Sequence, residues 1–242
     1  MKTKPTWLFV IILLAGCNGD VKSSHAAQQA DVASSNAAAV GAITFKINTI
    51  KQKIPDSDAP LGRWKINKTY PVLQSGKNPQ LANTLNQQIE MLVNQYGCKN
   101  KGDEDFNGEV MLDNGKVFSM RYEAMWLCGA MPHPDSTQGA LNYDVHANAI
   151  VILDEQFTDN TAQAAFTAAA LKRLNQEITT RSNKNQMICP AATKLGRFYL
   201  TPDSLVISAP VVEHADSACG VEVSFPRKDI NPQLKPTSVL RE

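Results

Sequence analysis

The first seventeen residues predict the compartment in which the rest of the chain must fold. Lys2 and Lys4 precede a short apolar run that ends in the sequence LAGC at residues 14–17. A basic start, an apolar stretch and small residues before the cleavage site are typical of a secretory signal peptide. A cysteine directly after the small pair is typical of a bacterial lipoprotein, in which it becomes acylated. We therefore expect residues 1–16 to be removed and Cys17 to carry the lipid.

Two other interpretations of this leader are a plain signal peptide and a single-pass membrane anchor. The apolar run is too short for an anchor, because a helix needs about 20 residues to cross a bilayer. Residues 17–42 are rich in Ala, Ser and Gln and have no aromatic side chain, so we expect the acylated cysteine to be followed by a flexible tether. The expected location is the bacterial cell envelope. Asn18 after the cysteine favours the outer membrane, facing the periplasm.

Four cysteines follow the expected anchor, and an even number in an exported chain predicts disulfides. Four cysteines allow three pairings. We favour the pairing Cys98–Cys128 with Cys189–Cys219, in which each disulfide joins neighbours in the sequence, closes a loop of about 30 residues and contributes ~3.6 kcal/mol through loop entropy. A zinc site or reactive thiols are the alternatives, but the chain has no Cys-x-x-Cys spacing. The four residues are Cys98, Cys128, Cys189 and Cys219.

The net charge excludes an electrostatic surface for nucleic acid. The whole chain carries a formal charge of +1, and loss of Lys2 and Lys4 with the leader changes it to −1. The length allows one domain with a substantial core, or two small ones. We expect a single domain over residues 43–242, with a division into two subdomains near residue 105 as an alternative.

Periodicity predicts an α+β fold, with an antiparallel sheet of several short strands packed with two main helices. The first helix starts at Pro79 after a capping Asn78, and the second covers about residues 161–181. A tight turn at residues 113–116 predicts a hairpin over residues 108–127. Apolar residues at every second position after this turn predict that one face of the second strand is buried. Arg121 and Glu123 on its other face are expected to be solvated. We also expect Trp64 to be a core residue.

Three stretches together resemble a known family. They are TYPVLQSGKNPQLANTLNQQI (69–89), CGAMPHPDSTQGALNYDVHANAIVILDEQF (128–157) and RFYLTPDSLVISAPVVEHADSACGVEVSFPRKDI (197–230). They are similar to the RsiV-like domain family of unknown function. This family includes the extracellular domain of a lysozyme-sensing anti-sigma factor and occurs beside peptidoglycan deacetylase domains and in bacterial lipoproteins. The chain departs from the family pattern by Met131-Pro132 before His133, and by Cys128 and Cys219. The resemblance implies lysozyme or another muramidase as the kind of partner.

Histidines and acidic residues supply the remaining candidates for chemistry. His133 lies in a Pro-flanked loop, and His146 follows Asp144 at a spacing that places both on one strand face. Convergence of these histidines with His214 would make a zinc or copper site. The residues that we expect to contact a partner come from the loop 131–136 and from a second loop over residues 212–218. They are Met131, His133, Asp135, Ser136, Glu213 and His214.

The sequence contains no nucleophile elbow, no zinc-protease motif and no phosphate-binding glycine loop. We therefore expect a binding protein rather than an enzyme, anchored by its lipid in the cell envelope, with no cofactor. Its expected partner is a lysozyme-like protein. The first alternative is a peptidoglycan or carbohydrate binder. The second is a metal-dependent or other hydrolase, which would need four residues to meet in one cleft: His133, His146, Asp135 and Asp144.

Overall fold

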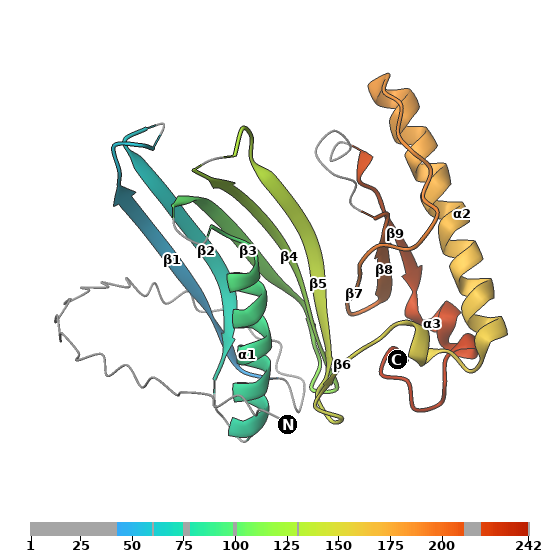
Figure 1. Ribbon diagram of the computed structural model, residues 1–242. Coiled ribbons are helices and arrows are strands. Elements are labelled where there is room, and N and C mark those ends of the chain that lie inside the picture. The colour runs from blue at the N-terminus through green and yellow to red at the C-terminus, as the bar shows by residue number, and fades with distance from the viewer. Residues whose placement is uncertain are drawn as a thin grey trace, which may run out of the picture.

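The computed structural model describes residues 43–59, 61–74, 78–98, 101–129, 131–210 and 219–241. The predicted signal peptide, the predicted lipidation site at Cys17 and the predicted tether lie outside these ranges, as do Glu213 and His214. The described chain has the predicted α+β fold. Figure 1 shows a large sheet with one helix on its face, beside a small sheet with a long helix of its own. No helix within the described ranges combines the length and the apolar character needed to cross a membrane.

The large sheet has six strands whose order in space is their order in the chain. All neighbouring strands are antiparallel except one pair in the middle, β2 and β3, which run parallel over four residues of each. Parallel neighbours need a crossover connection, and here it contains a helix. The strands are β1 (Phe45–Pro55), β2 (Arg63–Leu73), β3 (Gly102–Asp113), β4 (Val117–Cys128), β5 (Asp135–Asp144) and β6 (Ala149–Ile150).

The crossover helix is α1 (Pro79–Gln95), which begins as predicted. The Asn78 side chain accepts a hydrogen bond from the backbone N–H of Leu81 at 3.0 Å, and Pro79 occupies the first turn. Its apolar face packs on the sheet, where it forms one core with the alternate residues of β4 that the sequence predicts to be inward. The fully buried members of α1 and β4 in this core are Leu85, Ile89, Phe118 and Met120.

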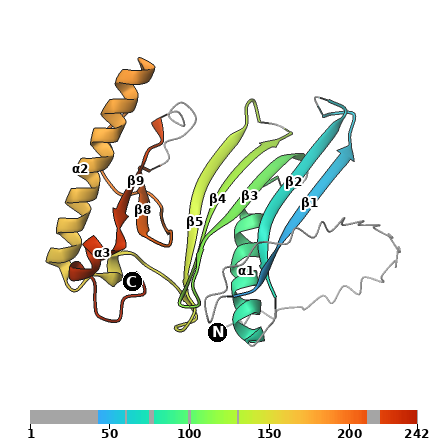
Figure 2. The same ribbon diagram turned by 180° about the vertical axis from the view of Figure 1, so that it is seen from behind.

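The small sheet consists of three antiparallel strands covered by α2 (Asn160–Asn185), as Figure 2 shows from behind. The helix is capped by Asp159 and is longer than the predicted 161–181. Phe166 of α2 contacts Phe225 with 5.0 Å between ring centroids. The other elements here are η1 (Asp154–Gln156), β7 (Phe198–Leu200), β8 (Ser204–Ser208), β9 (Glu222–Pro226), α3 (Arg227–Ile230) and η3 (Asn231–Gln233).

A β-bulge joins the two cores. The register of β3 against β4 shifts between Val110 and Leu112, which moves Leu112 to the face opposite α1. Leu112 and Val117, on either side of the hairpin turn, then pack with α2 and the small sheet. The alternative prediction placed a division into two subdomains near residue 105. This residue lies inside β3, where the large sheet continues from β2 to β4.

Both disulfides form with the favoured pairing. Cys98 and Cys128 are 5.3 Å apart between Cα atoms, and Cys189 and Cys219 are 5.5 Å apart. The first bridge joins the chain just after α1 to the end of β4. The second joins the segment after α2 to the start of the chain that enters β9. Each bridge therefore holds the end of a helix close to the sheet that the helix covers.

Candidate functional site

The predicted partner-binding loop is shorter than the sequence suggests. Asp135 and Ser136 are the first residues of β5, where they pair with Trp126 and Met125 of β4. The connection between β4 and β5 therefore ends at Pro134. Residues 132–134 are exposed, whereas Met131 is half-buried. The expectation that Asp135 and Ser136 belong to a loop was wrong. Pairing with β4 makes them the start of β5, although the sequence there has no alternation of apolar residues.

The base of this connection is tightly held. The disulfide of Cys128 precedes it, and the backbone N–H of Met131 donates to the carbonyl of Cys128 at 2.8 Å. On its other side, the backbone N–H of Ser136 donates to the Asp135 carboxylate at 2.8 Å. Pro134 also forms one wall of a small cavity of about 80 Å³, together with Met125 and residues 103–105 of β3. The exposed tip thus lies between a disulfide-bonded end of β4 and the first paired residues of β5.

The structure does not bring together the four residues that the hydrolase alternative requires. His133 precedes β5 and His146 follows it, so the length of the strand, roughly 30 Å, lies between them. Asp135 and Asp144 are the two ends of that strand. Among the described residues, no three His, Cys, Asp or Glu side chains form a group that could hold a metal ion. The hydrolase alternative required these four residues in one cleft, and they do not share one.

The geometry around His146 also differs from the prediction. His146 lies in a turn after β5, not on the face of a strand. The Asp144 carboxylate accepts hydrogen bonds from the backbone N–H groups of His146 and Ala147, at 2.8 and 2.9 Å. Asn148, with a φ of 53°, completes the turn. Asp144 therefore stabilises a turn, in the manner common for Asp and Asn side chains.

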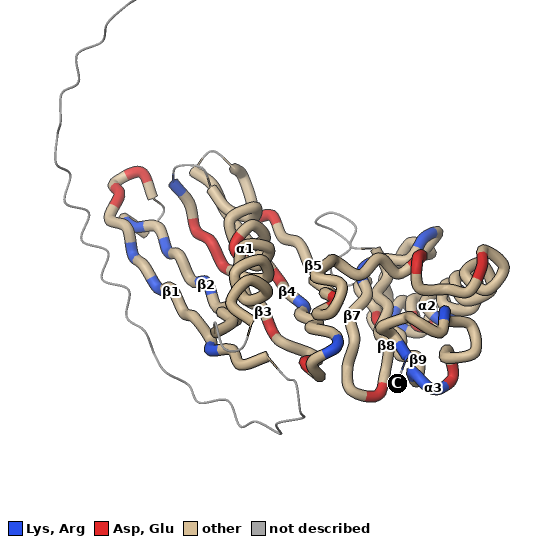
Figure 3. Tube along the Cα trace, turned by 90° about the horizontal axis from the view of Figure 1, so that it is seen from below, with Lys and Arg blue, Asp and Glu red and all other residues tan. Residues whose placement is uncertain are grey.

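The face of the large sheet opposite α1 is polar. From residue 105 to residue 109 of β3, exposed and buried residues alternate. Phe106 and Gly108 are buried against α1, whereas Asp105, Asn107 and Glu109 are exposed on the other side. Figure 3 shows that Lys and Arg mark β1 and β2 while Asp and Glu mark β3. A groove of about 570 Å³ lies on this face, where β1, β2 and β3 meet. Its polar residues are Lys51, Gln52, Lys53, Lys65, Asn67 and Asp105, and Ile66 completes the lining.

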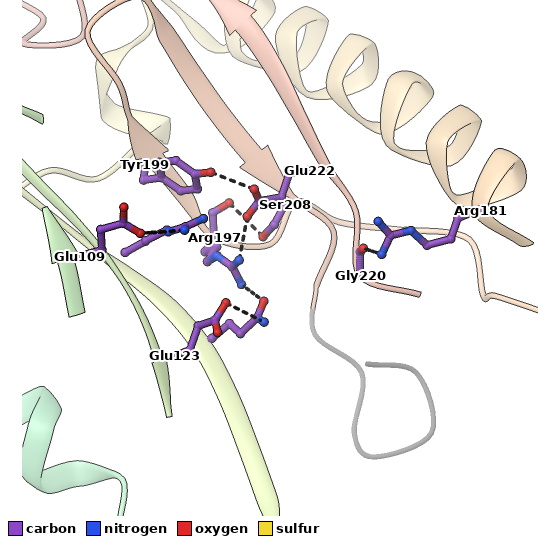
Figure 4. Close-up of polar contacts among 10 residues, drawn as sticks. Glu109, Glu123, Arg181, Arg197, Tyr199, Ser208, Gly220 and Glu222 are labelled. Atoms are coloured by element: carbon purple, nitrogen blue, oxygen red, sulfur yellow. Dashed lines mark hydrogen bonds and ion pairs between the residues drawn. The ribbon is translucent and has the colours of Figure 1, made fainter. Parts of the chain in front are cut away.

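A second polar group connects the two sheets, and Figure 4 shows its members. Arg197, just before β7, donates to the Gln138 side chain of β5 and forms an ion pair with Glu222 of β9 at 2.7 Å. The Tyr199 hydroxyl donates to the same carboxylate at 2.8 Å. Burial, and then this hydrogen bond, raise the pKa of Tyr199. The Glu222 carboxylate thus holds Arg197 and Tyr199 together, and the Arg197–Gln138 hydrogen bond reaches from there to the polar face of the large sheet.

The polar face of β4 is only partly exposed to solvent, because the small sheet covers part of it. Glu123 is exposed and accepts a hydrogen bond from Gln138 at 3.3 Å. Arg121 pairs with Glu109 at 2.7 Å, and this hydrogen bond raises its pKa. Ser119 is fully buried, because it accepts from the backbone N–H of Leu200 in β7. Alternation identifies which residues share a face, but it does not reveal that a second sheet covers part of it.

Sequence reasoning missed both the groove and the junction. One signal for the groove was present: residues 45–55 and 63–73 contain six Lys or Arg and no acidic residue. No comparable signal marks Arg197 or Glu222, whose meeting depends on the pairing of β7, β8 and β9. Within the described residues, the groove is a concave surface that gathers three lysines without an ion-pair partner. It can bind a charged, polar ligand without any chemical step.

Comparisons with known proteins show the fold. No family model matches the sequence, and no curated protein is similar to it. A solved structure of a DUF3298 family member from Bacteroides fragilis is similar with a TM-score of 0.56 and 13% identity, covering 84% of this chain and 98% of that one. A DUF3298 family protein from Pseudomonas aeruginosa gives a TM-score of 0.51 and 11% identity, with 80% and 95% covered. The chain therefore has the fold of the DUF3298 family, which is the RsiV-like domain that its three motifs resemble.

Proposed function

We propose that this chain is a non-enzymatic binding protein, anchored through a lipid on Cys17 in the bacterial cell envelope, that binds a lysozyme or related muramidase. The outer membrane, facing the periplasm, is the proposed location. The observation that carries the proposal is the exposed tip at residues 132–134, which projects from a base held by a disulfide and by the first pairs of β5. The resemblance of the three sequence motifs to the RsiV-like family, which includes the extracellular domain of a lysozyme-sensing anti-sigma factor, supports the same kind of partner.

The tip is suited to binding because little of its conformational freedom remains to be lost. Pro132 and Pro134 each fix one backbone dihedral and restrict the residue before them. Cys128 and the β4–β5 pairing fix both ends of the connection. A segment that is already ordered avoids much of the entropy cost of association. The exposed His133 between the two prolines is therefore held in a restricted range of positions.

Its chemistry matches a cleft lined by acidic side chains. Lysozymes act through two carboxyl groups in such a cleft, and an imidazole can donate a hydrogen bond to either of them. The tip alone is small compared with a standard interface, which buries about 800 Å² on each partner. Neighbouring exposed surface, including Met125 of β4, would have to contribute.

The test measures the heat of binding between the mature chain and several lysozymes. We expect micromolar or tighter binding to at least one of them and a loss of about tenfold or more for His133→Ala. His146→Ala is the matched control, because it removes the same side chain at the other end of β5. Mass spectrometry of the native product checks the acylation of Cys17. No binding to any lysozyme, or equal losses for the two variants, would refute the proposed partner.

A further inference from the structure

Charge is segregated between neighbouring strands of the large sheet. The first two strands carry cations and no acidic residue, whereas β3 carries acidic residues and no cation. One pair, Lys68 and Glu104, meets on the side of α1. The other cations of β1 and β2 form no ion pair with the acidic residues of β3. The cations are Lys46, Lys51, Lys53, Arg63, Lys65 and Lys68, and the acidic residues are Asp103, Glu104, Asp105, Glu109 and Asp113.

Three of the lysines converge on the polar face. Lys51 and Lys53 are two residues apart in β1 and therefore point to the same side. Lys65 of β2 lies directly opposite Lys53 in the register of the two strands. None of the three forms an ion pair within the described part of the chain. Like charges directly opposite each other destabilise a sheet, so this arrangement carries a cost that a bound anion would remove.

Protection of a sheet edge explains only part of the pattern. Lysines on an edge strand prevent it from pairing with other chains, and Lys51 and Lys53 lie on β1, which is an edge. Lys65 lies on β2, which has a neighbour on both sides. Protection of the edge also does not require a concave surface. The groove of about 570 Å³ at these lysines is of the size that proteins use for small ligands.

The remaining polar groups in the groove define the ligand further. The Asn67 amide donates to the Asp105 carboxylate at 2.6 Å, which fixes both side chains. On the same face, Asp103 accepts from the backbone N–H of Lys65 at 2.7 Å. Asp105 is exposed, so its carboxylate can accept further hydrogen bonds, as from hydroxyl groups. A ligand with an anionic group for the lysines and hydroxyl groups for Asp105 would therefore fit this groove.

We infer that this groove binds a sugar that carries an anionic group, with the anion at Lys53 and Lys65 and the hydroxyl groups at Asp105. A flat membrane surface fits less well, because a carboxylate forms part of the groove. The shared chemistry is an anionic sugar, and its charge could come from a carboxylate or from a phosphate. This inference does not depend on the proposed lysozyme partner, because the residues come from β1, β2 and β3 and not from the tip at 132–134.

The experiment titrates the mature chain with four probes and follows binding by calorimetry. Trigalacturonic acid supplies carboxylates, glucose 6-phosphate supplies a phosphate, maltotriose is neutral, and phosphatidylglycerol vesicles present an anionic surface. We expect binding of one or both anionic sugars, at least tenfold tighter than that of maltotriose. The variant carrying both Lys53→Gln and Lys65→Gln should lose at least tenfold in affinity. The first two probes distinguish the source of the charge.

A matched control carries Lys172→Gln and Lys228→Gln, which remove the same charge from exposed positions far from the groove in the chain. This control should bind the anionic sugar as the wild type does. Equal losses in the two double variants, binding to the vesicles alone, or no sugar bound at millimolar concentration would overturn the inference. His133→Ala should leave sugar binding unchanged, so the failure of one proposal is distinguishable from the failure of the other. Unfolding curves check that the variants remain folded.

Discussion

Two glutamates of β3 form ion pairs of equal length that differ in burial. Glu104 and Glu109 each lie 2.7 Å from a cation, Lys68 and Arg121 respectively. The side chains of the first pair are both 11% exposed, whereas in the second pair Glu109 is 53% and Arg121 37% exposed. The buried pair has further partners. Lys68 donates to the backbone carbonyl of Val93 at 3.2 Å, and Glu104 accepts from the backbone N–H of Cys98 at 2.8 Å.

Glu104→Gln should therefore cost far more stability than Glu109→Gln. The first substitution leaves the Lys68 ammonium buried under α1 without its counter-charge, a situation that costs about 3–5 kcal/mol. The second removes an exposed ion pair, which contributes about 0.2–1 kcal/mol. Both substitutions are isosteric, lie on one strand and break an ion pair of the same length. The difference between them then measures the effect of burial together with that of the further partners of the buried pair.

Urea unfolding with both disulfides intact is the assay, because the midpoint at an unchanged slope reports the free energy of unfolding. We expect a large shift of the midpoint for Glu104→Gln and almost none for Glu109→Gln. The double variant Lys68→Met with Glu104→Leu should recover most of the loss, since replacing both members of a buried pair by apolar residues is often neutral. Equal midpoints for the two single variants would show that the pair under α1 is as well solvated as the pair at the surface, and the reasoning would fail.

Two further predictions concern close packing and pH. Gly139→Ala would place a Cβ 2.2 Å from the buried Tyr122 ring, so we expect a loss of about 1–3 kcal/mol in the free energy of unfolding in the urea assay. Gly129→Ala, whose Cβ would have its nearest contact at 3.6 Å, should change the stability little. Equal effects of the two variants would contradict the packing argument. Hydrogen bonding to Lys101 is the largest cause that lowers the pKa of Asp56 from 3.8 to about 2. The pKa of Asp56 is lower in the folded than in the unfolded state. The contribution of this carboxylate to stability is therefore complete above pH 4 and is lost as the pH falls through 2. The stability difference between wild type and Asp56→Asn should shrink over that interval, and a constant difference would contradict the assignment.

Local signals in the sequence predicted local structure well. The cap of α1 was predictable because Asn78 and Pro79 act within one turn of the chain. The hairpin turn was predictable for a similar reason: the Asn114 side chain accepts from two backbone N–H groups within three residues, and Gly115 supplies a φ of 76°. The disulfide pairing was also predictable, because each bridge closes a short loop between cysteines that are neighbours in the sequence.

Interactions between distant segments were not predictable in this way. The parallel pairing of β2 with β3 depends on how α1 crosses the sheet, and alternation in each strand is the same for parallel and antiparallel neighbours. The burial of Ser119 depends on Leu200 of β7, which lies 81 residues further along the chain. The start of β5 at Asp135 depends on the length of β4 rather than on its own polar residues. In each case the partner strand, and not the local pattern, decides the outcome.

The groove shows the limit of sequence reasoning most clearly. The spacing of Lys51 and Lys53 already indicates that both point to one face, and the lack of acidic residues in the first two strands indicates an excess of positive charge. Neither observation places Lys65 opposite Lys53, because a shift of one residue in the register would turn Lys65 toward α1. The register is fixed instead by the apolar partners of the same strand, Trp64 and Tyr70, which must be buried. The position of the charged groove is thus a consequence of how the core packs, so a core residue of β2 can be essential to binding without touching the ligand.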